Sequence, residues 1–239
     1  MQQTSVKAAA VLGGFLFLGL AALGYLAGSS AIRIKEFERS VTVKGLAERE
    51  VPADIALWPI QYTAAGNDLT ALYAALERDT ATVQRFLEAQ GIEPAEITVA
   101  PPAVTDKLAQ QYGNGSNIEL RYTAVQTVTV YSPKVDVVRA AITRLAGLGK
   151  QGIVFSGGGY QGQTEYIYTG LNRVKPEMVE EATRKAREVA QKFAADSDSR
   201  LGKIRRASQG QFSISDRDKN TPYIKKVRVV STVEYYLSD

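Results

Sequence analysis

The sequence of 239 residues contains neither cysteine nor histidine. The first absence excludes disulfide bonds and thiol catalysis, and the second excludes every catalytic arrangement that pairs a serine or cysteine with histidine. Together they remove the most common ligands of zinc sites. Any catalysis would therefore depend on Asp, Glu, Lys, Tyr or Ser, while the lack of cysteine leaves the cellular compartment open.

A large excess of one charge is also missing. The 29 Lys and Arg residues face 25 Asp and Glu residues, which gives a formal net charge of +4. This balance is too mild to indicate nucleic acid as the partner. With 45% hydrophobic residues, most of the chain is able to fold around a core.

Charge is absent altogether from the N-terminal run Ala8 to Ile32, "AAAVLGGFLFLGLAALGYLAGSSAI". Its apolar part, Ala8 to Ala27, has the length of about 20 residues that a membrane-spanning helix needs. A cleaved signal peptide has a shorter apolar region, of about 7–15 residues, and a small-residue cleavage site. Ala27-Gly28-Ser29 and Ser29-Ser30-Ala31 fit such a site, but the length favours an uncleaved anchor.

We accordingly divide the chain into an N-terminal membrane anchor or uncleaved signal, residues 1–32, and one domain, residues 33–239. The orientation of the anchor stays open at this point. Lys7 precedes the apolar run and Arg33, Lys35 and Arg39 follow it, so the positive-inside rule predicts a cytoplasmic domain. A short basic start before an apolar stretch is typical of secretory signals and predicts the opposite.

Beyond residue 33 the hydrophobic pattern alternates between period two and period 3.6, which predicts strands and helices respectively. Strands with one apolar face are expected at Val41–Glu48, Ile55–Thr63, Ile97–Ala100, Ile118–Tyr131, Lys203–Ser213 and Tyr223–Leu237. Helices are expected at Asp68–Gln90, after Pro133, and from Pro176, the last with an inner face of Val179, Ala182, Ala186, Val189 and Phe193. The pattern predicts an α+β fold with mainly antiparallel sheets and about three packed helices.

Two of these strands are expected to be outer strands of their sheets. Pro59 lies inside Ile55–Thr63, and proline is usually confined to edge strands or bulges. Tyr223–Leu237 is the second candidate. Because an edge strand has unpaired backbone groups, these two are the expected sites of pairing between subunits.

The stretch "FSGGGYQGQTEY" places Gly157, Gly159 and Gly162 at the G-x-G-x-x-G spacing of dinucleotide-binding proteins. That chemistry requires a helix to begin within the glycine run, because the helix N-terminus holds the pyrophosphate. Here the run is followed by "TEYIYT", which is rich in strand-forming residues. We therefore expect no cofactor at this site, and interpret the glycines as a bend or bulge.

Two polar motifs also resemble binding sites. Asp216, Asp218 and Asn220 start like a calcium loop, but Thr221 stands where glycine is required and Val227 where glutamate is required. A polar hairpin loop without metal is the preferred interpretation.

The second motif is basic. Lys203, Arg205 and Arg206 would join Lys225, Lys226 and Arg228 in one basic patch if their strands pair. A solvated sheet face explains these residues as well as a lipid- or nucleic-acid-binding site does.

The stretch "KPEMVEEATRKAREVAQKFAADSDSRLGKIRRASQGQFSI", followed by "TPYIKKVRVVSTVEYYL", resembles the SIMPL-domain family of bacterial envelope proteins. The opening "VTVKGLAEREVPADIALWPIQY" is similar to the first strands of that family, and the resemblance covers about residues 40 to 238. Two features depart from it: Asp196 to Ser199 replaces a glycine at a helix end, and the N-terminal segment looks retained.

The resemblance implies an α+β fold, a periplasmic or membrane-facing domain, and assembly into ring- or cage-like homo-oligomers, with a link to stress tolerance. It supplies no catalytic, cofactor-binding or metal residues, and it favours a domain outside the cytoplasmic membrane. We expect a non-enzymatic, membrane-anchored, self-assembling envelope protein. Its partners would be itself and, through the N-terminal helix, the lipid bilayer, with no nucleic acid.

A periplasmic ligand-binding or signalling module is the alternative. A third hypothesis is an enzyme that uses carboxylates such as Glu180 and Glu181, which lie in a helix-face context where solvation is the usual explanation.

Overall fold

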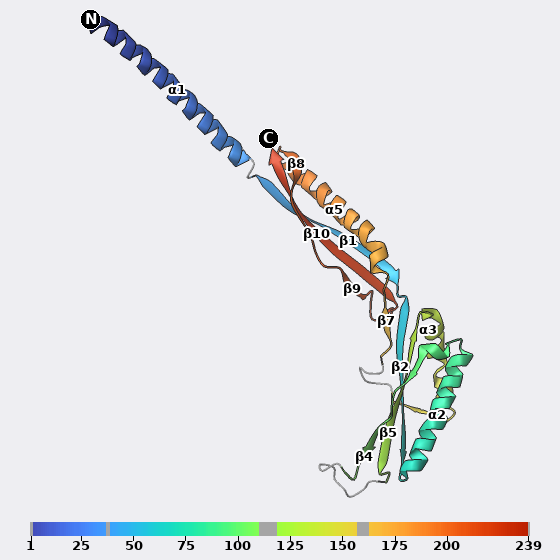
Figure 1. Ribbon diagram of the computed structural model, residues 1–239. Coiled ribbons are helices and arrows are strands. Elements are labelled where there is room, and N and C mark those ends of the chain that lie inside the picture. The colour runs from blue at the N-terminus through green and yellow to red at the C-terminus, as the bar shows by residue number, and fades with distance from the viewer. Residues whose placement is uncertain (1, 37–38, 110–118, 157–162, 239) are drawn as a thin grey trace. The chain divides into compact units, whose positions relative to one another are not determined.

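The computed structural model describes residues 2–36, 39–109, 119–156 and 163–238 (Figure 1). Its elements are α1 (Gln2–Glu36), β1 (Ser40–Pro52), β2 (Ile55–Gly66), α2 (Leu69–Ala89), the 3-10 turn η1 (Pro94–Glu96), β3 (Ile97–Val99), β4 (Ala103–Asp106), β5 (Tyr122–Ser132), α3 (Val135–Arg144), α4 (Ala146–Gly149), β6 (Val154–Phe155), β7 (Glu165–Ile167), α5 (Leu171–Asp196), β8 (Arg200–Gln209), β9 (Ser213–Asp216) and β10 (Ile224–Ser238). The predicted α+β class is confirmed, because every pair of strands with a described register is antiparallel.

The chain divides into two compact units. Unit 1 contains Met1–Glu48, Lys175–Ser213 and Arg228–Asp239, and unit 2 contains Arg49–Val174 and Ile214–Val227. The boundaries between the units fall inside β1, α5, β9 and β10.

Helix α1 is the one described helix that is long and apolar enough to cross a membrane. Its candidate span is Ala10–Ser29, and none of that span is buried against the rest of the protein. Large apolar side chains point outward along it, for example Phe15 and Phe17, each more than 70% exposed. Side chains of this kind require a lipid environment or removal of the segment, so α1 is either a signal sequence or a single membrane anchor.

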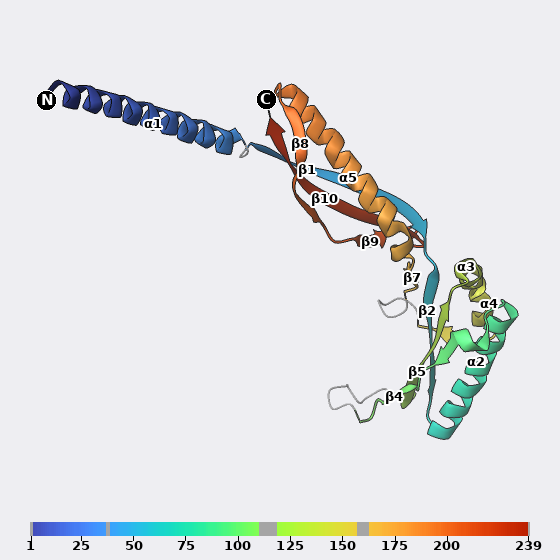
Figure 2. The same ribbon diagram turned by 45° about the horizontal axis from the view of Figure 1, so that its top comes forward.

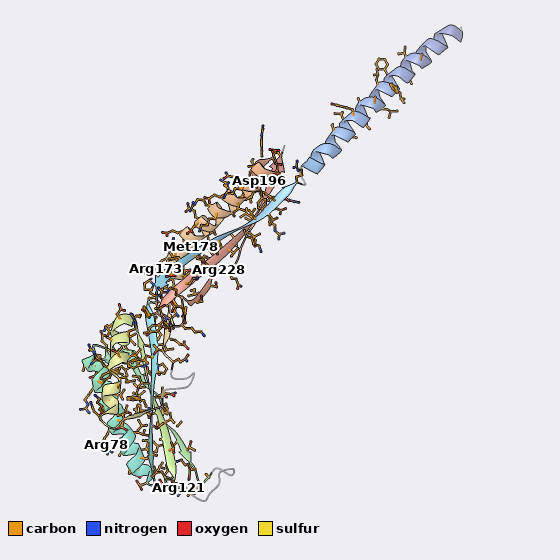
Figure 3. The ribbon with its side chains drawn as sticks, turned by 180° about the vertical axis from the view of Figure 1, so that it is seen from behind. Arg78, Arg121, Arg173, Met178, Asp196 and Arg228 are labelled. Atoms are coloured by element: carbon orange, nitrogen blue, oxygen red, sulfur yellow. The ribbon has the colours of Figure 1, made fainter. Side chains whose placement is uncertain are left out.

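Unit 1 is built from a sheet with the order β1-β10-β8, covered on one face by α5 (Figure 1). The buried stripe of α5 repeats every four residues: Met178, Ala182, Ala186, Ala190 and Ala194. Figure 3 labels Met178 and Asp196 toward the two ends of this helix. Because alanine side chains are short, the helix lies close to the strands beneath it.

The closest approach is at Gly45 of β1. A Cβ atom at this position would overlap the carbonyl oxygen of Ala182 and lie 2.5 Å from the amide nitrogen of Ala186. Only glycine therefore fits between the strand and the helix backbone. The neighbouring core residues Val43, Val233 and Tyr235 pack around this contact.

Two predictions about α5 were wrong. The helix begins at Leu171 and includes Pro176, whereas we expected it to start at Pro176. Of the expected inner face, Ala182 and Ala186 are buried, but Val189 and Phe193 are 38% and 54% exposed. The larger side chains are excluded because they do not fit where the helix and strand backbones nearly touch.

The turn after α5 explains the departure from the family pattern at Asp196 to Ser199. Asp198 has a φ of 50°, the left-handed conformation that glycine adopts most readily. The amide of Ser199 donates to the carbonyl of Ala194 at 2.8 Å, which closes the helix end. An aspartate thus occupies a conformation that glycine adopts most readily.

Unit 2 contains the six-stranded sheet, in the order β3-β5-β2-β6, with β4 also paired to β5 and β7 also paired to β2. The β2–β5 ladder is continuous from Ala56 opposite Ser132 to Gly66 opposite Tyr122. Helices α2, α3 and α4 lie on one side of these strands (Figure 2). Their apolar faces and the sheet enclose a core that includes Trp58, Tyr62, Leu87 and Val128.

Helix α2, which the sequence predicts at Asp68–Gln90, has a capping residue at its start and a glycine after its end. The Asp68 side chain caps it by accepting from the Ala71 amide at 2.7 Å, and Gly91, just beyond the C-terminus, has a φ of 88°.

The expected outer strands are both inner strands, which corrects our prediction. β10 lies between β1 and β8, and β2 lies between β5 and the pair β6 and β7. Pro59 is tolerated because β7 pairs with Ile55–Leu57 and β6 with Tyr62–Thr63, so Pro59 falls in the gap between these two short partners.

Gly45 supplies a test of the packing in unit 1. Gly45→Ala should lower the free energy of unfolding by about 3 kcal/mol, because the added methyl group must displace backbone atoms of α5. Urea unfolding of the detergent-solubilised chain, followed by far-UV circular dichroism, measures the change.

Gly66→Ala is the control, since the nearest atom to a Cβ there is 3.9 Å away. It should be neutral or stabilise by up to about 1 kcal/mol. Equal effects of the two substitutions would show that the close approach at Gly45 does not limit stability.

Candidate functional site

The side of the six-stranded sheet opposite α2 and α3 is the main candidate surface. Side chains alternate along a strand, so the register identifies which residues share this side. We call it the open face; its residues are Ile55, Leu57, Pro59, Gln61, Thr63, Ala65, Thr98, Ala103, Thr105, Thr123, Val125, Thr127, Thr129, Tyr131, Val154, Glu165 and Ile167. None of them belongs to the core beneath the helices.

The open face is nearly without charge. Among the residues of the open face, only Glu165 is charged at neutral pH. Threonine is the most frequent residue type on this face. Thr123 places a buried hydroxyl there that has no hydrogen-bond partner in the described part of the chain. At the end of the ladder, Tyr131 is 51% exposed.

The uncovered sheet face of unit 1, in contrast, carries several charged residues. The residues that alternate with the buried ones on β1, β10 and β8 include Lys44, Glu48, Arg206, Arg228 and Glu234. Arg205 Nη1 lies 2.9 Å from Glu234 Oε1, and Arg228 Nε lies 3.5 Å from Glu48 Oε1. A hydrogen bond from Ser40 and the Arg205 guanidinium lower the pKa of the Glu234 carboxyl. This face is an ordinary solvated surface, which makes the lack of charge on the open face of unit 2 a distinguishing feature.

A groove of about 280 Å³ lies beside the sheet, between α2 and β3. Its lining is Tyr73, Leu76, Glu77, Thr80, Ala81 and Gln84 from α2 with Val99, Ala100, Pro102 and Gln126 from the sheet side. Gln126 Nε2 donates to the carbonyl of Ala100 at 2.5 Å, which fixes the amide at the groove wall.

Thr80 links this groove to the core. Its hydroxyl donates to the carbonyl of Leu76 at 2.7 Å, so it accepts from the Tyr62 hydroxyl, whose oxygen is 2.6 Å away. Burial raises the pKa of the Tyr62 phenol above its ordinary value, although the bond to Thr80 opposes this. A neutral, hydrogen-bonded phenol of this kind serves packing, because it is buried and does not reach the groove.

The glycine run Gly157, Gly159 and Gly162 lies outside the described residues. A short distance beyond it, Glu165–Ile167 forms β7, which pairs with β2. The first described helix after the glycine run is α5, which begins at Leu171.

The carboxylates of the calcium-like motif accept hydrogen bonds from, or pair with, neighbouring residues of the protein. Asp218 accepts from the amides of Asn220 and Thr221, both at 2.8 Å, and from the side chains of Thr221 and Arg217. These bonds, with Thr221 first, lower the pKa of the Asp218 carboxyl strongly. Asp216 pairs with Lys225. The motif is therefore a polar hairpin loop, as the sequence indicated.

The single basic patch that pairing of β8 with β10 would have allowed does not form. β8 and β10 do pair, but Arg206 lies opposite Glu234 and Gln209 opposite Ser231. The strand β8 therefore ends before it reaches Lys225, Lys226 and Arg228, and the two groups of basic residues stay separate. The correction follows from the register, which the sequence does not reveal.

The carboxylates Glu180 and Glu181 both lie on α5. Glu180 is exposed, and Glu181 forms an ion pair of 2.6 Å with Lys185, one turn away. Among the described residues no group of three or more Asp or Glu side chains is placed to hold a metal ion. The features of the described residues that can be built into a candidate site are the open face and the groove beside α2.

A comparison with protein-family models matches residues 41–235 to SIMPL, described as "Protein of unknown function (DUF541)". The chain belongs to the SIMPL family. The match begins in β1 and ends in β10, so it includes both units and leaves out α1. No curated protein matches the chain.

Sequence reasoning missed both the open face and the groove of this SIMPL domain. The alternation of threonines at Thr123, Thr127 and Thr129 was visible, but it indicated only a solvated face. The lack of charge became apparent when the register placed residues of several strands side by side. The groove depends on α2 and β3, whose contact no local pattern predicts.

The Tyr62–Thr80 hydrogen bond gives a second testable prediction. Thr80→Val should reduce the free energy of unfolding by about 1–3 kcal/mol, because it leaves the buried Tyr62 hydroxyl without an acceptor. Adding Tyr62→Phe removes that orphan group, so the double variant should lose less than the sum of the two single variants. Urea unfolding followed by the fluorescence of Trp58, the single tryptophan, measures all three. If the loss of unfolding free energy in the double variant equals the sum of the two single losses, the Tyr62–Thr80 hydrogen bond would be contradicted.

Proposed function

We propose that this SIMPL protein is a membrane-anchored, self-assembling envelope protein that acts without catalysis. Helix α1 would hold it in the bacterial inner membrane, with residues 33–239 in the periplasm. Copies would associate into a ring- or cage-like homo-oligomer with a structural or stress-protective role, the role that the family resemblance implies.

The uncharged open face is the observation that supports self-assembly. A sheet face that stays in water normally carries Lys and Glu, as the uncovered face of unit 1 does. Depletion of charge together with an exposed tyrosine is instead characteristic of the centre of protein–protein interfaces. Threonine methyl groups and hydroxyls would allow such a face to pack and hydrogen-bond at once.

The size of the open face fits this role. The β2–β5 ladder runs from Ala56 to Gly66, a length of roughly 35 Å at about 3.3 Å per residue. With the flanking strands the width is roughly 19 Å at about 4.8 Å per strand. Two copies packed face to face would bury roughly 1,300 Å², within the range of about 1,200–2,000 Å² that stable interfaces use.

Such a contact is isologous and closes a dimer, so a ring requires a second contact elsewhere. The corrected sheet order changes where that contact is to be sought. The edges of the sheet in unit 1 are β1 and β8, and neither of the strands that we expected to be outer ones is available.

The groove beside α2 favours the alternative, a ligand-binding or signalling module. Its volume of about 280 Å³ is close to the lower end of small-molecule sites, about 300 Å³. Ala81→Trp would fill it, since Ala81 is an exposed lining residue. A compound that raises the melting temperature of the wild type and not of this variant would support the alternative.

Charge on the open face tests self-assembly. Thr127 lies opposite Gln61 in the middle of the ladder, so Thr127→Lys places an unpaired ammonium at the centre of the contact. The apparent dissociation constant should rise at least about tenfold. Light scattering or mass photometry of the full chain in mild detergent, over a range of concentrations, measures it.

Thr232→Lys is the matched control, because Thr232 is also half-buried on an inner strand but belongs to the charged face of unit 1. It should leave the mass unchanged. A single-chain mass for the wild type would refute self-assembly, and a mass that both variants lower equally would refute the open face as the contact. A wild-type mass above that of a dimer would show that a second contact between subunits exists.

The location of the domain can be tested separately, since the chain has no native cysteine. Ala95 is exposed in η1, so Ala95→Cys gives an accessible thiol. A membrane-impermeant thiol reagent should label it in cells whose outer membrane alone is permeabilised. Labelling only after the inner membrane is broken would reverse the orientation, and a mature chain that begins near Ser30 would exclude the anchor.

A further inference from the structure

Strand β8 is the most basic element of the described chain and is exposed along almost its whole length. Its sequence "RLGKIRRASQ" contains Arg200, Lys203, Arg205 and Arg206. From Ser199 to Ser215 no acidic residue occurs. Every residue of β8 except Leu201 is exposed, and β10 is its partner on one side in the sheet.

Most of this positive charge is not neutralised within the protein. Arg205 pairs with Glu234 at 2.9 Å and lies 5.8 Å from the centre of the Tyr236 ring. Arg200, Lys203 and Arg206 form no salt bridge with any described carboxylate, although the charge of Arg206, opposite Glu234, helps to lower the pKa of that carboxyl. Three cationic side chains along one edge therefore remain available to an anionic partner.

A second copy of β8 does not suit this edge. Two such strands in antiparallel pairing would place lysines and arginines against lysines and arginines, and like charges opposite each other destabilise a sheet. The partner of β8 must be anionic, so this edge differs in chemistry from the uncharged open face of unit 2.

The chain path keeps β8 near the point where α1 ends. Helix α1 ends at Glu36 and β1 starts at Ser40, a connection that spans at most about 14 Å. The Leu237 amide donates to the carbonyl of Arg39 at 2.9 Å, and Ser238 pairs with Arg200. The start of β8 is thus two strand spacings, about 10 Å, from the start of β1.

We propose that β8 binds the anionic lipid surface of the membrane in which α1 is anchored. Lys203 and Arg206 would contact headgroup phosphates, and Ile204, which is 44% exposed, follows Lys203 on the same exposed strand. The attachment through α1 confines β8 near this surface and makes weak headgroup contacts effective. The proposal rests on the anchoring role of α1 stated above.

The experiment uses the full chain, with its lack of native cysteine, in lipid nanodiscs. Ile204→Cys carries a nitroxide label, and Ile214→Cys, a 40% exposed isoleucine of β9, is the matched control. Collision with a lipid-bound nickel chelate, relative to a soluble one, reports proximity to the headgroups. The discs contain either neutral lipid alone or about 30% anionic lipid.

The label at position 204 should show a collision ratio at least about threefold higher in the anionic discs than in the neutral ones, and the label at 214 should show no difference. Lys203→Gln with Arg206→Gln should abolish the increase. Lys203→Arg with Arg206→Lys should retain it, because the charge and not the side-chain shape is required. Salt at about 1 M should also remove it.

A chain that enters the discs while the label at 204 reports water in both lipids would overturn the proposal and leave the anchor intact. If the collision ratio at position 204 rises equally in the Lys203→Gln, Arg206→Gln variant, the proposal would be overturned too. The basic residues would then serve only to protect a sheet edge. A chain that does not co-purify with the discs would refute the anchor and this inference together.

Discussion

The contact between Gly45 and the backbone of α5 is the constraint on which unit 1 depends. It sets the distance between helix and sheet, and that distance decides which side chains fit between them. Alanines fill the stripe from Ala182 to Ala194, while Val189 and Phe193 are displaced to the flank. The hydrophobic area that each alanine buries is small, so α5 contributes through dense contact over a long helix, and the larger core side chains, such as Tyr235 and Val233, come from the strands.

The two sheets differ in how they use the face that no helix covers. In unit 1 the face carries ion pairs such as Arg205–Glu234 and is well solvated. In unit 2 the corresponding face has threonines and apolar residues with Glu165 alone as a charge. The β8 edge adds a third kind of surface, one of uncompensated positive charge. A single chain thus presents one surface suited to a neutral partner and another suited to an anionic one, and the two would not compete for the same ligand.

Local signals predicted the elements well, and the reasons are physical. The period-two faces of β5 and β10 appear as predicted, because alternation reflects burial on one side of a strand. Asp68 and Gly91 bound α2 as capping chemistry requires. The family resemblance was confirmed over residues 41–235.

Apart from the start of α5, the failures involve contacts between residues that are distant in sequence. The order of strands depends on which strands pair, so β2 and β10 were wrongly placed at edges, and the register separated two basic groups that strand pairing would have allowed to unite. The inner face of α5 was misjudged because hydrophobicity favours Val189 and Phe193, whereas the space beside Gly45 favours alanine. The open face was missed for the same reason, since its composition is a property of several strands read across the ladder.

The repeat of α5 restricts how this helix can change in length. Each residue of an α-helix turns the chain by about 100°, so one residue inserted between Ala182 and Ala194 would rotate the rest of the stripe away from the sheet. An insertion of four residues would return it to within about 40° and would place another short side chain in line only if the new turn also carried alanine. We therefore expect homologues to vary the length of this helix in whole turns, and to gain or lose an alanine with each one.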